Sequence, residues 1–284
     1  MSTPAVIAEG LGFTEGPLWT AAGSLWVVGL SRGVIYELRP GGQPRIRAET
    51  GGNPSGLCQA ADGVVWIAQG GTHRQNRSHR IAVPSIQRVI HETVEDVVTS
   101  GLDAPNDCAI GPDGLLWFTD PRGEAMTDSG PPGRVCTLDA ITREVTTRAT
   151  GIRYPNGIAF ADGGSALYIA ETGTARVLRY ACDESGMRFD AVFAELPKGR
   201  PDGLALDCDG RLYVAATDSH TVQVFGPDGD PGEVIDLGPG SFPTNLCFGG
   251  ADLRTLFVTT VGRGRVYAVR RETAGMPLGN GQST

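Results

Sequence analysis

The sequence predicts an all-β fold, a six-bladed β-propeller, and three features support this prediction. A short motif recurs six times along the 284 residues, and internal repeats of this kind are typical of propellers and solenoids. Successive copies lie 40 to 51 residues apart, which suits four short strands per unit. The 41 glycines show no collagen-like period and accompany 40% hydrophobic residues, which is typical of a turn-rich β protein rather than a disordered chain.

The motif is clearest between residues 200 and 217. Pro201 and the polar residue Asp202 precede a short apolar strand, and Asp209-Gly210 then supplies the backbone angles of a tight turn. A second strand opens with an aromatic residue, Tyr213. Anchor and aromatic residue lie eleven residues apart in four units, and twelve or thirteen apart in the other two. The six pairs are Glu15 and Trp26, Ser55 and Trp66, Asn106 and Trp117, Asn156 and Tyr168, Asp202 and Tyr213, and Thr244 and Phe257.

Each unit continues into a third strand and a fourth strand that leads to the next anchor. We expect fourth strands at 94–98, 145–148, 191–194 and 234–237. The sixth unit has only three strands of its own, so the N-terminal run at 5–9 should pair with the last of them and remove an open sheet edge. The alternative, six unrelated hairpins in a sandwich, does not require the regular spacing.

The chain is therefore predicted to form one propeller domain over residues 1–284, with residues 272–284 as a flexible tail. A net charge of −8 and the lack of a basic stripe argue against a nucleic-acid partner. No leader-like segment or apolar run of membrane-spanning length occurs, so we expect no membrane partner and a cytoplasmic location. A monomer or weak homodimer is expected.

The six cysteines form no Cys-x-x-Cys pair, and no Cys/His spacing indicates a zinc site. Four of them lie in or beside the first strand of a unit, where small apolar residues pack between blades: Cys58, Cys108, Cys208 and Cys247. We expect buried free thiols in a reducing compartment.

The anchors should surround one mouth of the central channel, because each precedes the innermost strand of its blade. This ring contains two carboxylates, two carboxamides and two hydroxyls: Glu15, Asp202, Asn106, Asn156, Ser55 and Thr244. Two carboxylates in a narrow mouth repel, and burying either one unpaired costs several kcal/mol. Either one is protonated or a cation lies between them, and hard oxygen ligands suit Ca²⁺ or Mg²⁺. A hydrogen-bonded polar plug without a metal is the alternative.

Two insertions could face this mouth. The basic loop at 71–80 is either a solvated connection or a lid over the site. Asp120, Arg122 and Glu124 follow a second strand and either contact a polyol substrate or hold their own loop by an ion pair. Asp218 and His220 are expected to cap a turn.

Four of the motifs together resemble the SMP-30/gluconolactonase/LRE family of regucalcin-like lactonases. They are Glu15-Gly16-Pro17, Pro105-Asn106-Asp107, Pro155-Asn156-Gly157 and Pro201-Asp202-Gly203, in this order and at these separations. The resemblance extends over about residues 9–267 and includes the run 247–250 with the strand 256–260 of the last unit.

This resemblance implies a divalent metal held by Glu15, Asn156 and Asp202. Calcium is the expected ion, and Mg²⁺, Mn²⁺ and Zn²⁺ are alternatives. The resemblance also implies that Asn106 lies near the metal or substrate and that Asp107 and Glu124 are candidate substrate contacts. Sugar-lactone-specific members often carry arginine where this chain has Ala104, and Arg122 is the candidate replacement.

The expected reaction is hydrolysis of a lactone, most simply a sugar aldonolactone, to the hydroxy acid. The metal would polarise the carbonyl group, and the resemblance implies that Asp202 is the general base. Two alternatives stay open: phosphotriester or organophosphate hydrolysis at the same mouth, and a non-catalytic propeller that binds a protein or carbohydrate. The two acidic anchors argue against the non-catalytic alternative.

Overall fold

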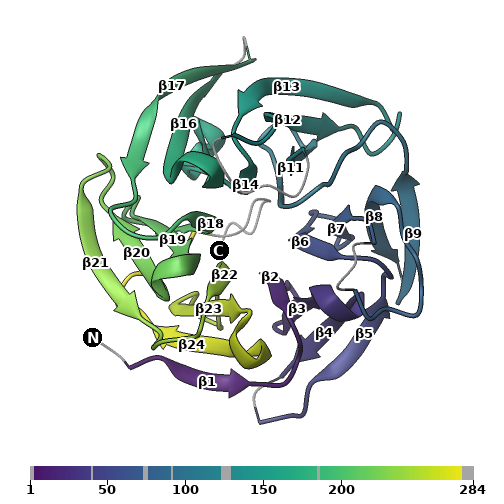
Figure 1. Ribbon diagram of the computed structural model, residues 1–284, viewed down its shortest axis with the longest axis horizontal. Helices are drawn as coiled ribbons and strands as arrows, with labels where there is room; N and C mark the ends of the chain where they lie inside the picture. Colours follow the sequence, from purple (N-terminus) through teal and green to yellow (C-terminus); the bar gives the residue numbers. More distant parts are fainter. Residues whose placement is uncertain are drawn as a thin grey trace.

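Each repeat of the sequence forms one antiparallel four-stranded sheet, because its short apolar runs are separated by glycine-containing turns. The computed structural model describes residues 3–39, 41–72, 76–90, 92–122, 129–183 and 186–276. Within these residues, six such sheets surround a central axis like the blades of a propeller (Figure 1). The predicted fold class is confirmed.

The strands of each blade follow one another from the axis outward, except in the sixth blade. Blades 1 and 2 contain β2 Thr14–Trp19, β3 Leu25–Gly29, β4 Val34–Leu38 and β5 Arg45–Glu49, then β6 Pro54–Gln59, β7 Val65–Gly70, β8 Pro84–Ile90 and β9 Thr93–Val98. Blades 3 and 4 contain β10 Cys108–Ile110, β11 Leu116–Asp120, β12 Gly133–Leu138 and β13 Val145–Ile152, then β14 Pro155–Phe160, β15 Ala166–Glu171, β16 Arg176–Asp183 and β17 Gly186–Glu195. Blades 5 and 6 contain β18 Pro201–Leu206, β19 Leu212–Ala216, β20 Thr221–Phe225 and β21 Pro231–Asp236, then β22 Pro243–Gly249, β23 Thr255–Thr260, β24 Val266–Arg270 and β1 Ala5–Ala8.

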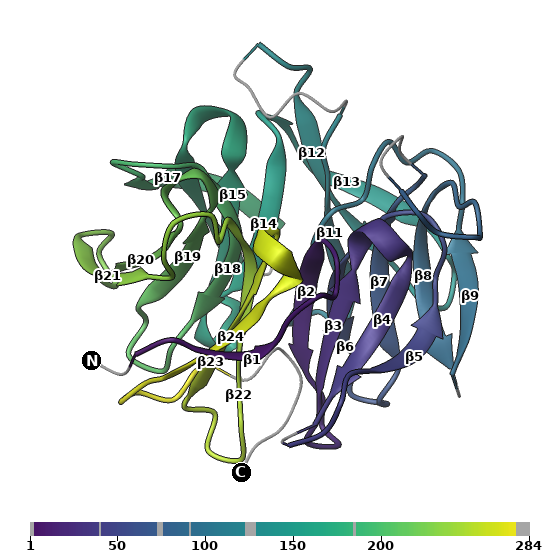
Figure 2. The same ribbon diagram turned by 60° about the horizontal axis from the view of Figure 1, so that its bottom comes forward.

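The ring is closed by the N-terminal strand, as predicted. In Figure 2, β1 runs along β24 before the chain enters β2. Ala5 pairs with Ala268 and Val6 with Tyr267, both antiparallel. The outermost strand of blade 6 therefore comes from the other end of the chain, and the edge of β24 is covered.

The core lies between neighbouring blades, so both faces of a blade are largely apolar. The aromatic residues that open the second strands are all buried: Trp26, Trp66, Trp117, Tyr168, Tyr213 and Phe257. Among them, Tyr213 and Phe257 contact rings of the neighbouring blade: Tyr213 meets Phe248 edge to face at 5.1 Å, and Trp19 stacks on Phe257 at 5.7 Å. The regular anchor-to-aromatic spacing thus places one large side chain at each junction between blades.

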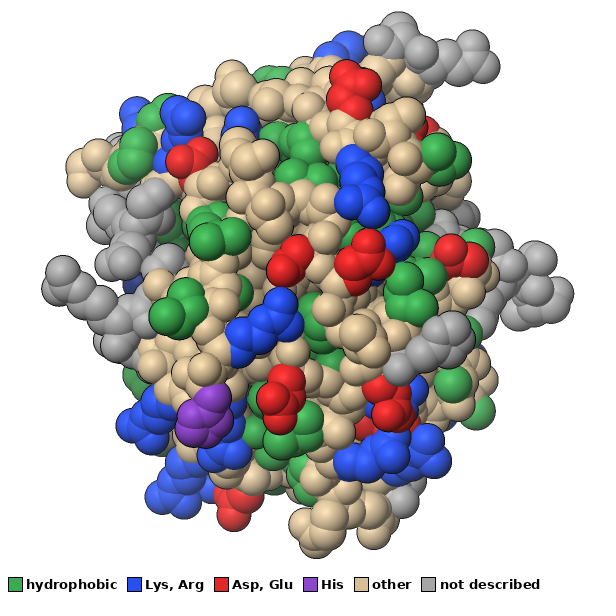
Figure 3. Space-filling model, turned by 90° about the vertical axis from the view of Figure 1, so that its right-hand side faces the viewer, with side chains coloured by type: hydrophobic (Ala, Val, Ile, Leu, Met, Phe, Trp, Pro, Cys, Tyr) green, Lys and Arg blue, Asp and Glu red, His purple; other side chains and the backbone are tan. Residues whose placement is uncertain are grey.

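The outer strands are polar and exposed. On the side of the molecule seen in Figure 3, basic and acidic side chains are interspersed rather than segregated. Glu95, for example, forms ion pairs with Arg88 at 2.9 Å and with Arg143 at 3.3 Å. Exposed pairs of this kind contribute only about 0–1 kcal/mol each, so the stability of the fold resides mainly between the blades.

The segment after β24 is anchored beneath the channel by backbone hydrogen bonds. Cys208 N–H donates to the Ala274 carbonyl at 2.9 Å, and Met276 N–H donates to the Leu206 carbonyl at 2.9 Å. The tail that we expected from residue 272 is therefore held to blade 5 as far as Met276. Residues 277–284 lie outside the described part of the chain.

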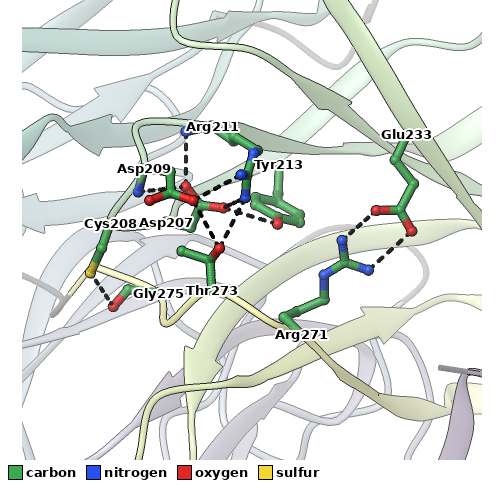
Figure 4. Close-up of polar contacts among 9 residues, drawn as sticks. All are labelled: Asp207, Cys208, Asp209, Arg211, Tyr213, Glu233, Arg271, Thr273 and Gly275. Carbon is green, nitrogen blue, oxygen red and sulfur yellow. Dashed lines mark hydrogen bonds and ion pairs between the residues drawn. The ribbon is translucent and has the colours of Figure 1, made fainter. Parts of the chain in front are cut away.

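A buried carboxylate secures this segment from the side of blade 5 (Figure 4). Asp207 is fully buried and accepts hydrogen bonds from Arg211 Nη1 at 3.0 Å and from the Tyr213 hydroxyl at 3.1 Å. The same Arg211 nitrogen donates to Thr273 Oγ1 at 3.1 Å. Next to this cluster, Arg271 pairs with Glu233. These bonds hold the segment at 271–276 against blade 5.

The cysteines are free, but they are not all buried. Cys58, Cys108, Cys136 and Cys247 are buried, Cys182 is half-buried and Cys208 is exposed. The expectation of a buried thiol was wrong for Cys208, because this residue follows the end of β18 and lies in the turn toward β19.

The helices in the described part of the chain are single 3-10 turns of three residues, and none has the length or apolar character of a transmembrane segment.

Thr14 makes the joint between the first and last blades, and its replacement by valine should weaken ring closure. Its hydroxyl donates to the Thr260 carbonyl at 2.8 Å and accepts from Thr260 N–H at 2.9 Å, and both residues are fully buried. Thr14→Val leaves these groups unpaired, so we expect a loss of about 1–3 kcal/mol in the free energy of unfolding. Urea denaturation measures this. Thr146→Val, on the exposed strand β13, is the matched control and should change little; equal losses in the two variants would contradict the role of the joint.

Candidate functional site

The anchor residues lie at the start of the inner strands, at the end of the channel that we call the mouth. In five of the six blades, the pairing of the first two strands shifts by one residue at the anchor. Pro54 pairs with Gln69 and Leu57 with Ile67, so β6 contains one residue more than β7 over this stretch. A bulge of this kind bends the strand and changes the direction of a side chain. The bulges therefore set the anchors apart from the flat pleat of their strands.

Glycines after the anchors allow neighbouring inner strands to approach closely. A Cβ atom built on Gly16 would lie 2.1 Å from the Ser55 carbonyl oxygen, and one on Gly157 would lie 2.3 Å from the Asp202 carbonyl oxygen. Real Cβ atoms do not approach other atoms so closely. Glycine is thus required for close approach of the backbones, and this approach brings the anchors of adjacent blades together.

The three residues predicted to hold a metal meet at this mouth. Glu15, Asn156 and Asp202 are each at least 92% buried, with exposed fractions of 5%, 3% and 8%. The Glu15 and Asp202 carboxylates repel each other, and hydrogen bonding from Asn156 favours the ionised form of Asp202. Thr217 Oγ1 also donates to Asp202 Oδ2 at 3.2 Å. Residues almost two hundred positions apart in sequence therefore share one electrostatic environment.

This environment is costly for negative charge. Burial raises the pKa of Glu15 well above its usual value, and the neighbouring Asp202 and Asp107 carboxylates raise it further. Burial likewise raises the pKa of Asp202 to about 8, and the pKa of Asp107 to about 6. Among the ion pairs between described residues, none involves these three carboxylates. Arg200, which pairs with Asp218 at 2.6 Å, nevertheless lowers the pKa of Asp202 through its positive charge.

A divalent cation fits this set of donors. Glu15, Asp202 and Asn156 offer only oxygen ligands, and Ca²⁺ and Mg²⁺ prefer oxygen. Two buried carboxylates without an ion pair provide the negative charge that such an ion neutralises. No cluster of three His, Cys, Asp or Glu side chains with metal-ligand spacing occurs in the described ranges, so an amide must complete the candidate set.

Three of the predicted substrate contacts, Asn106, Asp107 and Arg122, lie in the described part of the chain. Asn106 is half-buried at the mouth, where its Oδ1 accepts a hydrogen bond from Ser55 Oγ at 3.5 Å. Asp107 is buried, and its Oδ2 accepts a hydrogen bond from Ile158 N–H of the adjacent blade 4 at 3.3 Å. Arg122 is half-exposed and pairs with Asp103 at 3.1 Å.

Glu124 and His73, Arg74 and Gln75 of the 71–80 loop lie outside the described residues. The contact of Glu124 therefore stays a prediction, and both interpretations of the 71–80 loop, a solvated connection or a lid, stay open. Asp218 lies in the 3-10 turn at 217–219, which ends at His220, and it pairs with Arg200 at 2.6 Å.

One ring residue, Thr244, and one predicted substrate contact, Asp120, have structural roles instead of facing the candidate ligands. Thr244 Oγ1 donates to the Thr14 carbonyl at 2.7 Å and so helps to join blades 6 and 1. Asp120 is fully buried, accepts Arg134 Nη2 at 2.7 Å and accepts Ala104 N–H at 2.7 Å. Asp120 thus supports the backbone at the position where the expected arginine is absent.

The sequence analysis missed Asn245, a buried residue whose amide lowers the pKa of both Glu15 and Asp107. It follows its anchor at the same offset at which Asp107 follows Asn106. Comparing the residue after each anchor, rather than the anchors alone, would have revealed it.

The chain is thus a six-bladed propeller with two buried carboxylates and a carboxamide at the mouth of its channel. Residues 13–262 match the model of the SMP-30/Gluconolactonase/LRE-like region. This match covers most of the sequence, and the chain belongs to that family.

Relatives in this family carry several activities. The chain is 27% identical to a gluconolactonase of Zymomonas mobilis over 318 residues, which cover 97% of this chain and 83% of the relative. It is 33% identical to diisopropyl-fluorophosphatase of Loligo vulgaris over 172 residues, about half of each protein. A calcium-binding protein of Agrobacterium tumefaciens, regucalcin, has the same fold, with a TM-score of 0.75, 21% identity, and coverage of 97% of this chain and 96% of the other.

The raised pKa values predict that cation binding at this mouth releases protons. Without a cation, Asp202 keeps its proton up to about pH 8, whereas its usual pKa is 3.8. The cation-free protein should therefore lose stability as pH rises from about 4 to about 8, because the folded state binds more protons than the unfolded state over this range. Calcium affinity should rise over the same range.

Titration calorimetry in buffers of different ionisation enthalpy measures the protons released at pH 7. Asp202→Asn should release fewer, and Asp228→Asn, an exposed turn residue, should match the parent. Calcium binding without net proton release at pH 7 would contradict the coupling.

Proposed function

We propose that this chain is a metal-dependent lactonase that hydrolyses a sugar aldonolactone to the hydroxy acid. The observation that carries the proposal is the buried Glu15 and Asp202 pair, which lies at the channel mouth without an ion pair. A purely structural propeller has no need for two such charges, because each costs several kcal/mol when buried unpaired. The gluconolactonase relative, matched over nearly the whole chain, supports a lactone as the substrate.

Glu15, Asn156 and Asp202 would hold one divalent cation, with calcium as the proposed ion. Carboxylate and amide oxygens are suitable calcium ligands, and the similarity to a calcium-binding propeller favours this ion over Mg²⁺, Mn²⁺ or Zn²⁺. When bound, the cation would supply a positive charge for the oxygen on which negative charge develops. Three protein ligands leave open positions, because Ca²⁺ takes 6–8 oxygens.

Asp202 is the proposed general base. In its ionised form it would accept a proton from the attacking water, whose oxygen adds to the lactone carbonyl carbon. The ring C–O bond then breaks, and the ring oxygen takes a proton and becomes the hydroxyl group of the product. Thr217 fixes the orientation of the Asp202 carboxylate through its hydrogen bond at 3.2 Å. General bases of this kind contribute about 10²–10⁴-fold to the rate.

Asn106, Asp107 and Arg122 are the proposed substrate contacts among the described residues, with Glu124 as a further candidate. Asn106 is half-buried at the mouth, where its Oδ1 accepts a hydrogen bond from Ser55, and its amide N–H groups donate no hydrogen bond to another described residue. A hydroxyl-rich substrate offers acceptors for such donors. Arg122 already pairs with Asp103, so it would contact substrate only after exchanging this partner.

Asp202→Asn should keep the fold but lose turnover. An amide cannot accept the water proton, so we expect kcat to fall by about 10²–10⁴-fold. A pH-indicator assay on an aldonolactone with added calcium measures the rate, and circular dichroism checks the fold. Asp228→Asn is the matched control, because it makes the same change in an exposed turn. A parental kcat in Asp202→Asn would remove this residue from the role of base.

Phosphotriester hydrolysis is the second candidate, because the diisopropyl-fluorophosphatase of Loligo vulgaris is 33% identical over about half of the chain. A cation at the same mouth would polarise P=O as readily as C=O. Comparing kcat/KM on an aldonolactone and on diisopropyl fluorophosphate separates the two. We expect the lactone to have the larger value; the reverse order would favour the second candidate.

A further inference from the structure

The second strand of each blade ends beside the residues that precede the anchor of that blade. The last residues of these strands are Gly29, Gly70, Asp120, Glu171, Ala216 and Thr260. Among these six, only Asp120 and Glu171 carry a carboxylate, and both are buried. They belong to blades 3 and 4, whose anchors are the asparagines Asn106 and Asn156. The two carboxamide anchors thus differ from the other four in having a buried acid at the end of the adjacent strand.

Glu171 holds the turn that leads into Asn156. Its Oε1 accepts the Arg153 N–H at 2.8 Å, and its Oε2 accepts Arg176 Nε at 3.0 Å. Asp120 makes the same two bonds in blade 3, with a backbone N–H before the anchor at 2.7 Å and with an arginine of the third strand at 3.0 Å. In both blades the arginine balances the charge of the carboxylate, and the other carboxylate oxygen is a fixed acceptor for the backbone.

The turn held by Glu171 contains a strained residue. Tyr154 has a φ of 54°, in the left-handed region that bulky residues rarely adopt. Such a conformation costs about 1–3 kcal/mol and persists only where the surrounding contacts enforce it. Two more bonds do so here: Thr172 N–H donates to the Tyr154 carbonyl at 3.2 Å, and Gly173 N–H donates to the Arg153 carbonyl at 3.0 Å. Three bonds from one short segment therefore hold the backbone just ahead of the anchor of blade 4.

Thr172 extends this contact to the next blade. It is buried, and its hydroxyl donates to the Pro201 carbonyl at 2.7 Å. Pro201 directly precedes Asp202. The strands that carry the two anchors, β14 and β18, are neighbours around the channel (Figure 1). Two of the three candidate cation ligands, Asn156 and Asp202, are therefore linked through one pair of adjacent residues.

We infer that Glu171 and Thr172 together position the ligands of the candidate cation site. Glu171 holds the strained turn before Asn156, and Thr172 holds the backbone before Asp202, so the pair fixes the separation of the two ligands. This inference rests on the proposed function, in which both anchors bind the cation. Glu171 is a positioning residue and not a further ligand, because protein groups already engage both of its carboxylate oxygens.

Calcium binding to chelator-treated protein, measured by titration calorimetry, tests this without any activity assay. Two double variants keep the net charge of the parent and lack the ion pair: Glu171→Met/Arg176→Met and Glu171→Gln/Arg176→Met. Only the second keeps a side-chain oxygen that can accept the Arg153 N–H. We expect calcium affinity to fall by about 10–100-fold in the first variant, the usual effect of losing a group that orients a metal ligand. The second variant should stay close to the parent.

Glu37→Met/Arg45→Met is the matched control. Glu37 is a buried carboxylate that pairs with Arg45 at 2.9 Å. It lies opposite Trp26, near the start of β3 and therefore at the end of blade 1 away from the mouth. Removing this pair should lower the melting temperature without changing calcium affinity.

Parental calcium affinity in the first variant, an equal loss in both Glu171 variants, or an equal loss in the control would overturn the inference. If the first variant does not fold by circular dichroism, Thr172→Val is measured in its place. This substitution removes only the hydroxyl that reaches Pro201 and keeps a similar volume, and unchanged affinity would again overturn the inference.

Glu15→Gln separates a failure of the inference from a failure of the proposed metal site. If this variant binds calcium as tightly as the parent, or if the parent binds none, the proposed site is wrong and the inference falls with it. If Glu15→Gln binds weakly while the folded first variant binds normally, the metal site stands and only the role of Glu171 fails.

Discussion

The structure depends on the close approach of neighbouring inner strands at the channel mouth. Four glycines allow it, since a Cβ atom on Gly157 would already lie 2.3 Å from the backbone of the next blade. The bulges at the same level break the regular pleat. Because backbones approach so closely, carboxylates from blades 1 and 5 share one small space, and no ion pair between described residues neutralises them. The electrostatics of the site follow from this packing.

Packing between the blades offsets the free-energy cost of burying two acids at the mouth. Burial raises the pKa of Glu15 and Asp202, so in the cation-free protein these acids oppose folding at neutral pH. The interfaces between blades, with an aromatic residue at each junction, supply the opposing stability. Cation binding would relieve the repulsion, which couples occupancy of the site to the stability of the ring.

The two ends of the channel differ in chemistry although the same strands form both. At the mouth the inner strands begin with polar anchors. At the other end they line a small cavity of about 70 Å³ with apolar side chains such as Leu57, Ile158 and Leu204, and Met276 from the C-terminal segment closes it. The polar anchors therefore gather where the strands begin. Closure of the ring by β1 and anchoring of the segment up to Met276 hold both ends in place.

The sequence by itself determined the number of blades, the closing strand and the anchors, because these follow from local periodicity and turn chemistry. Glu15, Asn156 and Asp202 were predicted to meet, and the structure brings them together. Only the tertiary structure decided how individual side chains are used. Thr244 joins two blades, Asp120 supports the backbone at Ala104, and Cys208 is exposed. These outcomes depend on how the folded segments pack, which spacing along the chain does not encode; they arise when six similar strands pack around one axis and each polar group must find a partner.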